Sequence, residues 1–242
     1  TTGVGWNHGV DLGSGNEVTS GSTYQTLVAS GVGGGISIIG TANEWAVLIR
    51  NGTKLLTNGG PLNIKAGAGG AGAQLYLRNS STQWWGSAAA SSVTSSNSNL
   101  LIEFDNYNFG GASPNIATQG SVTWQSASNS FAAGGIWSSW LNWNQNGQVP
   151  SSITLGKTTN TKAITFDAAL SAAGPISVFG GNIAVNSNIT ATGGDILLDA
   201  DTGSTLSQST SGISLASNVT VKTLTSGDIT MIGRSGNANA SL

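Results

Sequence analysis

Glu103 and Asp105 are two carboxylates whose spacing could support acid–base chemistry. They flank Phe104 in a strand-like run, and alternation along a strand would place both on one face, about 6–7 Å apart. A pair at that separation can serve as the two catalytic groups of a glycoside hydrolase. The same spacing arises wherever a strand has a solvated face, and Leu101 would share this one. We therefore expect outward-facing charges, with a catalytic pair as the alternative.

A second acidic group could bind calcium. Asp195, Asp199 and Asp201 offer hard oxygen ligands around a turn that contains glycine. The spacing of an EF-hand loop is absent, and so is the Gly-Gly-x-Gly-x-Asp repeat of calcium-binding rolls. We therefore expect these aspartates to form turns, and they are weak candidates for a calcium site.

The chain has one histidine, His8, and no cysteine. A Ser/His/Asp or Cys/His site would need that histidine beside a nucleophile. No serine stands in a Gly-x-Ser-x-Gly motif between a strand and a helix. We expect His8 at the surface or at an edge, and we expect no catalytic residue, no enzyme activity and no cofactor.

Six of the eight tryptophans lie between positions 84 and 143. Amphipathic rings beside serine and asparagine are typical of surfaces that stack on sugar rings or anchor a protein interface. In the alternative, a loop folds back and the rings form a satellite core on the side of the fold. The structural interpretation is favoured, while protein and glycan contacts stay open. The candidate binding residues are Trp84, Trp85, Trp124, Trp137, Trp140 and Trp143.

Composition restricts the surface and the partners. Charged residues make up only 7% of the chain, so the surface must be hydroxyl and amide rather than ionic. The net charge is −2, and the eight Lys and Arg are scattered. This argues against nucleic acid, because phosphate neutralisation needs clustered cations. No apolar run approaches the length of a membrane span. We expect neither nucleic-acid binding nor membrane insertion.

Apolar residues at a regular spacing indicate which strands position the candidate side chains described above. Ile or Leu recurs every six or seven residues, mostly within short stretches that alternate as a strand with one buried face does. Three beats make about 20 residues, after which the pattern returns, and such a period without helices predicts a parallel β-solenoid. The expected strands lie at Ile164, Leu170, Ile176, Ile183, Ile189 and Ile196, and the beat continues through Ile213, Val219, Leu224 and Ile229.

Glycine and asparagine mark the expected corners between these strands. Glycine supplies sharp corners because it tolerates conformations that other residues avoid, and asparagine suits left-handed corners. The glycines are Gly181, Gly194, Gly212 and Gly227. The asparagines are Asn182, Asn188 and Asn218.

We divide the chain at residue 150. The part 150–242 carries the regular repeats, whereas 1–149 has similar strands with wider inserted loops, at 66–73 and 87–99. Strands in the first part are predicted within 35–38, 45–49, 62–64, 74–77, 100–104 and 121–124. Because the repeat still runs at 227–231, we expect the chain to be an excised piece.

The run from Ala163 to Leu198 resembles the repeats of filamentous-haemagglutinin-like adhesins, very large bacterial exoproteins whose stalks are full of Gly-[Asn/Asp]-Ile-x-apolar units. The resemblance covers about 150–242 well and 1–149 loosely. It implies a right-handed parallel β-helix, export across the outer membrane and a role at the cell surface. The secretion domain of that family often carries an Asn-Pro-Asn-type motif, and the nearest run here is Ser113-Pro-Asn-Ile. The resemblance assigns no binding residue.

These observations favour a non-enzymatic, secreted surface protein: a β-helical adhesin or stalk segment that contacts a host or neighbouring cell, matrix or glycans. The alternative is a subunit of an extracellular filament, because open solenoid ends expose unpaired strand edges that could stack end to end. A carbohydrate-active β-helix enzyme is a weaker alternative, since acids and bases are sparse.

Overall fold

The computed structural model describes residues 8–12, 26–42, 45–50, 53–67, 74–78, 84–86, 97–109, 113–132, 136–200 and 212–234. In these residues the chain forms strands and two short 3-10 helices, η3 (Ser138–Trp140) and η4 (Gln145–Gly147), and no α-helix. Every strand pairing with a defined register is parallel. The expected all-β fold of stacked parallel strands is confirmed.

The chain forms two compact units. Unit 1 comprises Thr1–Ser121 with Trp140–Gln148, and unit 2 comprises Val122–Ser139 with Val149–Leu242. The division at residue 150 stays a prediction from composition and repeat regularity. Within the described part of the chain, no helix is both long and apolar enough to cross a membrane.

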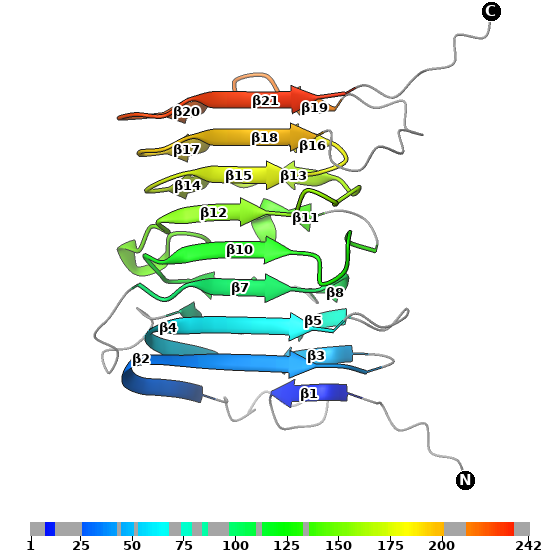
Figure 1. Ribbon diagram of the computed structural model, residues 1–242, viewed down its shortest axis with the longest axis vertical. Coiled ribbons are helices and arrows are strands. Elements are labelled where there is room, and N and C mark those ends of the chain that lie inside the picture. Colours follow the sequence, from blue (N-terminus) through cyan, green and yellow to red (C-terminus); the bar gives the residue numbers. More distant parts are fainter. Residues whose placement is uncertain are drawn as a thin grey trace, which may run out of the picture. The chain divides into compact units, whose positions relative to one another are not determined.

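Unit 2 is built from three parallel sheets, and successive strands enter the three sheets in turn (Figure 1). The first sheet contains, in order, β21 (Ile229–Gly233), β18 (Ile196–Ala200), β15 (Ile176–Phe179), β12 (Ser152–Leu155) and β10 (Ser121–Gln125). The second contains β11 (Ile136–Trp137), β13 (Ile164–Phe166), β16 (Ile183–Val185) and β19 (Ile213–Leu215). The third contains β14 (Leu170–Ala172), β17 (Ile189–Ala191) and β20 (Val221–Thr223). From β12 to β20, each coil thus adds one strand to every sheet.

The register confirms the expected period. Ile164 pairs with Ile183, 19 positions further on, and Ile176 pairs with Ile196, 20 positions further on. The next coil is longer, because Ile196 pairs with Ile229, 33 positions on. Most of its extra length lies between β18 and β19, where residues 201–211 are outside the described part.

The core of unit 2 consists of the inward residues of these short strands. All six strands expected between positions 164 and 196 begin at the predicted residue. In each, the first and third residues are buried and the second is half-buried. A strand of three residues cannot bury its own apolar face, so its side chains are covered by the same positions of the coils on either side.

Two of the corner glycines are required by close approach between coils. Gly194 and Gly227 have φ of 87° and 115°, a region that residues with a Cβ rarely adopt. A Cβ at Gly227 would lie 2.1 Å from the carbonyl oxygen of Gly194. The two corners therefore stack directly, without room for side chains.

The strand starts expected at Val219 and Leu224 are wrong, and of the three asparagine corners expected to be left-handed only Asn218 is. Val219 and Leu224 do not begin strands, since the strand between them, β20, begins at Val221. Asn218 adopts the left-handed conformation with φ of 62°, and this turn delays the strand by two residues. Asn182 and Asn188 are not left-handed. Instead, Asn188 Oδ1 accepts a hydrogen bond from the Thr220 amide at 2.8 Å.

Unit 1 has the same parallel pairing with longer strands. One sheet runs β1 (His8–Leu12), β3 (Trp45–Arg50), β5 (Gln74–Arg78) and β8 (Asn106–Asn108). In the other, β2 (Thr26–Gly40) pairs with β4 (Lys54–Ala66), the two long strands coloured blue and cyan in Figure 1. The opposite edge of β4 pairs with β6 (Trp84–Gly86) and β7 (Leu100–Glu103), and β6 also pairs with β9 (Asn115–Ile116).

Hydroxyl groups align successive coils inside unit 1. The buried Thr57 hydroxyl donates to Ser98 Oγ at 2.7 Å, and the buried Thr118 hydroxyl donates to the Ser98 carbonyl oxygen. Because each buried polar group has a partner, this interior row avoids the penalty of an unsatisfied hydroxyl. At the surface, Arg50 donates two hydrogen bonds to Asp11, at 2.9 and 3.0 Å.

The strands predicted in 1–149 are present, within β2, β3, β4, β5, β7 and β10. The shortest ones, such as β6, β8 and β9, were not predicted. Of the two expected loops, residues 68–73 and 87–96 lie outside the described part.

Ile164→Ala tests the stacked core. Ile164 pairs with Ile136 and Ile183, and all three are buried. We expect a loss of about 2–5 kcal/mol in unfolding free energy, because truncation leaves a cavity. The control is Thr165→Ala, at the next, half-buried position of the same strand, which should cost under about 1 kcal/mol. Urea denaturation followed by circular dichroism measures both, and equal losses would contradict an inward-facing Ile164.

Candidate functional site

The six candidate tryptophans do not form one surface patch. Trp85, Trp124 and Trp143 are buried, Trp140 is half-buried and Trp137 is exposed. The backbone of Trp84 lies in β6, while its side chain is outside the described part. A buried ring has no free face for a sugar, so among the five candidates whose side chains are described only Trp137 and Trp140 present tryptophan surface.

Trp85 shows how a tryptophan of this group serves the core. It lies in β6 between Leu55 of β4 and Ile116 of β9, both of which are buried. Its indole Nε1 is buried and has no hydrogen-bond partner among the described residues. The ring therefore acts as apolar volume in the core of unit 1, within a sheet strand rather than in a loop that folds back on the side of the fold.

Trp140 belongs to an aromatic cluster in unit 1, which we define as Phe104, Tyr107, Phe109 and Trp140. The Tyr107 ring centre lies 4.1 Å from that of Trp140 and 5.2 Å from that of Phe109, to which it is stacked. Phe104 lies beneath, fully buried, and meets Tyr107 edge-on at 5.9 Å. The other three rings are half-buried, so the cluster is a small core with an accessible outer side.

Backbone pairing holds the two sides of this aromatic cluster. Tyr107 lies on β8, the last strand of its sheet. Behind Trp140, the Asn142 amide donates to the Pro114 carbonyl oxygen at 3.0 Å and the Ile116 amide donates to the Asn142 carbonyl oxygen at 2.9 Å. The side chain of Asn142 also donates to Asn115 Oδ1 at 3.0 Å. This asparagine pair continues the strand spacing and fixes where the chain following Trp140 lies in unit 1.

Trp137 lies in unit 2 on β11, where its ring points outward beside Thr165 in the paired strand. The same outward row continues through Ala184 and Ser214. These side chains are small, so the indole stands at the edge of a flat, uncharged surface. We name this row, Trp137, Thr165, Ala184 and Ser214, the Trp137 face.

Asp167 holds the turn that follows Trp137. Its Oδ1 accepts the Ser139 amide at 2.9 Å, and its Oδ2 accepts the Ser139 hydroxyl at 2.5 Å. The buried Ser138 hydroxyl also contacts Asp167 Oδ1 and accepts the Ala168 amide at 2.9 Å. A carboxylate at the start of a helical turn satisfies amides that have no partner within the turn.

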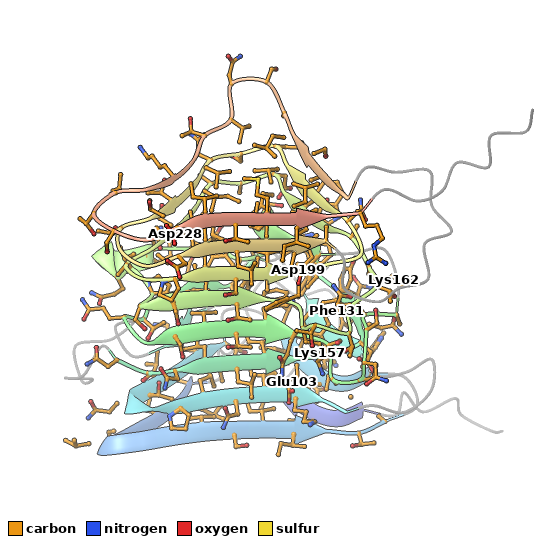
Figure 2. All side chains as sticks on the ribbon, turned by 45° about the horizontal axis from the view of Figure 1, so that its top comes forward. Glu103, Phe131, Lys157, Lys162, Asp199 and Asp228 are labelled. Atoms are coloured by element: carbon orange, nitrogen blue, oxygen red, sulfur yellow. The ribbon has the colours of Figure 1, made fainter. Side chains whose placement is uncertain are left out.

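Glu103 and Asp105 do not share a strand face. Strand β7 ends at Glu103, so the alternation that would have aligned them stops there. Glu103, labelled in Figure 2, forms an ion pair with Lys65 at 3.3 Å. Asp105 is buried beside the buried Phe104. The expected outward-facing pair is therefore wrong for Asp105.

The calcium candidates are also separated. Asp195 Oδ1 accepts the amide of Asp228 in the next coil at 2.9 Å, which is the turn role expected of it. Asp199 lies within β18 rather than in a turn, and in Figure 2 it lies towards the other end of the stacked strands from Asp228. Asp201 and the His8 side chain lie outside the described part. Within that part, no three acidic, histidine or cysteine residues are grouped to hold a metal.

The chain matches no known protein-family model, no curated protein sequence and no solved structure. The resemblance to filamentous-haemagglutinin-like adhesins therefore stays a prediction from the repeat pattern. Function has to be inferred from the surfaces of this chain.

Asp167→Ala should loosen the turn after Trp137. Hydrogen bonds to a charged group are worth about 1.5–3 kcal/mol, so we expect the Ser139 amide to exchange with solvent at least about tenfold faster. Hydrogen exchange read by mass spectrometry measures this. Asp167→Asn keeps an acceptor oxygen and should retain most of the protection. Unchanged exchange in the alanine variant would show that the carboxylate does not hold the turn.

The hydroxyl of Tyr107 should lose its proton at a higher pH than that of an ordinary tyrosine. Burial raises the pKa of its hydroxyl above the ordinary value of 10.0, because the folded protein disfavours the charged phenolate. The stabilising contribution of the neutral form is therefore present below pH ~10 and is lost as the pH rises through the raised pKa. Subtracting the tyrosinate absorbance titration of Tyr107→Phe from that of the wild type isolates this residue. A midpoint at or below about 10 would contradict the burial effect.

Proposed function

We propose that this chain is a segment of a non-enzymatic bacterial surface protein, a β-helical stalk or adhesin that contacts cells, matrix or glycans. The observation that carries the proposal is the repeated coil of unit 2, in which the same inward positions recur in each sheet. Such a fold lengthens by adding coils, each joined to the next by apolar stacking and backbone hydrogen bonds. It displays its outward residues at regular spacing.

The charged groups of the described residues support a structural role. Arg50 pairs with Asp11, Lys65 pairs with Glu103, and Asp167 holds a turn. Each of these charges is already engaged in aligning neighbouring segments. The weaker alternative, a carbohydrate-active enzyme, would need an acid and a base positioned at one substrate. Its best candidate residue, Glu103, forms an ion pair with Lys65 instead.

The Trp137 face is the surface best suited to contact a partner. An exposed indole can stack on a sugar ring or anchor a protein interface, and the small neighbours Thr165, Ala184 and Ser214 leave its approach open. The surface carries no charge of its own, so it suits a neutral glycan or an uncharged protein patch. The aromatic cluster of unit 1 offers a second, less exposed aromatic surface.

Trp137→Ala tests the adhesive role. Beads coated with the wild-type chain should adhere to cells, matrix proteins or arrayed glycans, and the variant should lose about 30-fold in affinity, since truncation of a central tryptophan costs about 2 kcal/mol or more. Trp137→Phe keeps an aromatic face and should lose less. Far-ultraviolet circular dichroism should be the same for all three. If wild-type beads adhere no better than uncoated beads, the adhesive role is wrong.

A further inference from the structure

Exposed apolar side chains in the described part of the chain are concentrated at two places. Nine large apolar residues are exposed there. One is Trp137. The other eight are Val28, Val32 and Ile39 on β2, which we call the N-terminal edge, and Leu215, Leu224, Ile229, Met231 and Ile232 in and beside β19–β21, which we call the C-terminal edge. Apolar surface gathered in this way marks an interaction site rather than scattered exposure.

The C-terminal edge is exposed because no further coil covers it in the described chain. Ile229 pairs with Ile196 and Met231 pairs with Leu198. The two residues of the inner coil are 0% exposed, whereas Ile229 is 43% and Met231 is 41% exposed. The side chains thus occupy inward positions that every earlier coil of unit 2 buries. β21, drawn in red in Figure 1, also leaves one side of its backbone without a strand partner among the described residues.

The N-terminal edge in unit 1 is also open, although one of its inward residues, Ile38, is buried. Within the described residues β2 pairs only with β4. Val28 pairs with Leu56, yet Val28 is 44% exposed and Leu56 is 2% exposed. Val32, in the irregular stretch of the same strand, is 91% exposed. This edge therefore also presents apolar side chains and an open parallel strand.

We propose that the C-terminal edge of one copy of this chain binds the N-terminal edge of a second copy, so that β21 and β2 pair in parallel. This goes beyond the proposed adhesive role, because it gives the chain itself as the partner. Backbone amides and carbonyls of the two open edges would satisfy each other, as in strand addition. The apolar side chains of both edges would be covered at the same time.

The pairing geometry favours this head-to-tail contact over a symmetric one. A two-fold axis would bring β21 against another β21 in antiparallel orientation and would leave β2 uncovered. Every pairing described in this chain is parallel, and the head-to-tail contact continues that geometry while covering both edges. The two edges meet without a run of like charge, since Lys222, Asp228 and Arg234 are mixed in sign. A head-to-tail contact leaves one open edge at each end of the assembly, so further copies can add to it, and it builds a filament unless the rotation between copies closes a ring.

Two blocked variants of the full chain test the proposal. Ile229→Lys with Met231→Lys blocks the C-terminal edge, and Val28→Lys with Val32→Lys blocks the N-terminal edge, because lysine on an open strand prevents pairing. All four positions are exposed, so the fold should survive. Ser177→Lys, at the half-buried second position of β15 and outside both edges and the Trp137 face, is the control for added charge. Circular dichroism and thermal unfolding check each variant.

Size-exclusion chromatography with light scattering, together with electron microscopy, measures the mass and length of the assemblies. The wild type and Ser177→Lys should form polymers that lengthen with concentration, and each blocked variant alone should be a monomer. An equal mixture of the two blocked variants should double the monomer mass and grow no further, because it contains one competent edge of each kind.

Two outcomes would overturn the proposal. One is a wild type that stays monomeric at every concentration. The other is dimers formed by the variant blocked at the N-terminal edge alone, which would indicate a symmetric contact between C-terminal edges. Neither outcome bears on adhesion, which is measured separately through Trp137.

Discussion

The structure depends on one constraint: an inward side chain must lie on the corresponding side chain of the next coil. In unit 2, Ile164 lies between Ile136 and Ile183, and none of these three short strands could bury its apolar face alone. Register is therefore set by the match of one coil to the next. Extra residues are tolerated only between strands, as between β18 and β19, where the coil lengthens while the pairing of Ile196 with Ile229 is kept. Glycine corners such as Gly227 follow from the same constraint, because the coils approach too closely for a side chain.

This constraint also explains how much of the fold could be predicted from the sequence. Between 164 and 196 the inward residue of each strand is a large aliphatic residue at nearly even spacing, so the strands and the period could be predicted to the residue. The prediction failed at Val219 and Leu224, which are apolar but lie beside the left-handed turn at Asn218. It also missed β8 and β9, which are two or three residues long and lie outside the regular spacing that reveals the equally short strands of unit 2. Such strands exist only because a neighbouring coil presents a partner.

The candidate site was harder to predict, because the sequence does not reveal on which side of a strand an aromatic ring lies. Trp85 and Trp137 both follow the start of a short strand, yet one is fully buried and the other exposed. Where strands are regular, alternation would separate them, but β6 and β11 are too short to show it. The aromatic cluster joins Tyr107 to Trp140, 33 positions away, through a backbone bridge at Asn115 and Asn142 that has no apolar signal. A bridge of this kind could not be predicted from a single sequence.

The repeat that builds this fold also determines where apolar side chains are exposed and can bind a partner. Each coil is covered by its neighbours, so the inward apolar side chains of an interior coil are buried, whereas a coil without a neighbour exposes the same residues that elsewhere form the core. Ile229 and Ile196 are equivalent in position, and only the presence of a covering coil distinguishes them. Natural sheets usually protect such edges with charge, proline or a covering segment, and β21 has none of these within Ile229–Gly233. With few charges to repel a second chain, the open edges and the outward Trp137 are the exposed apolar surfaces that the described residues offer a partner.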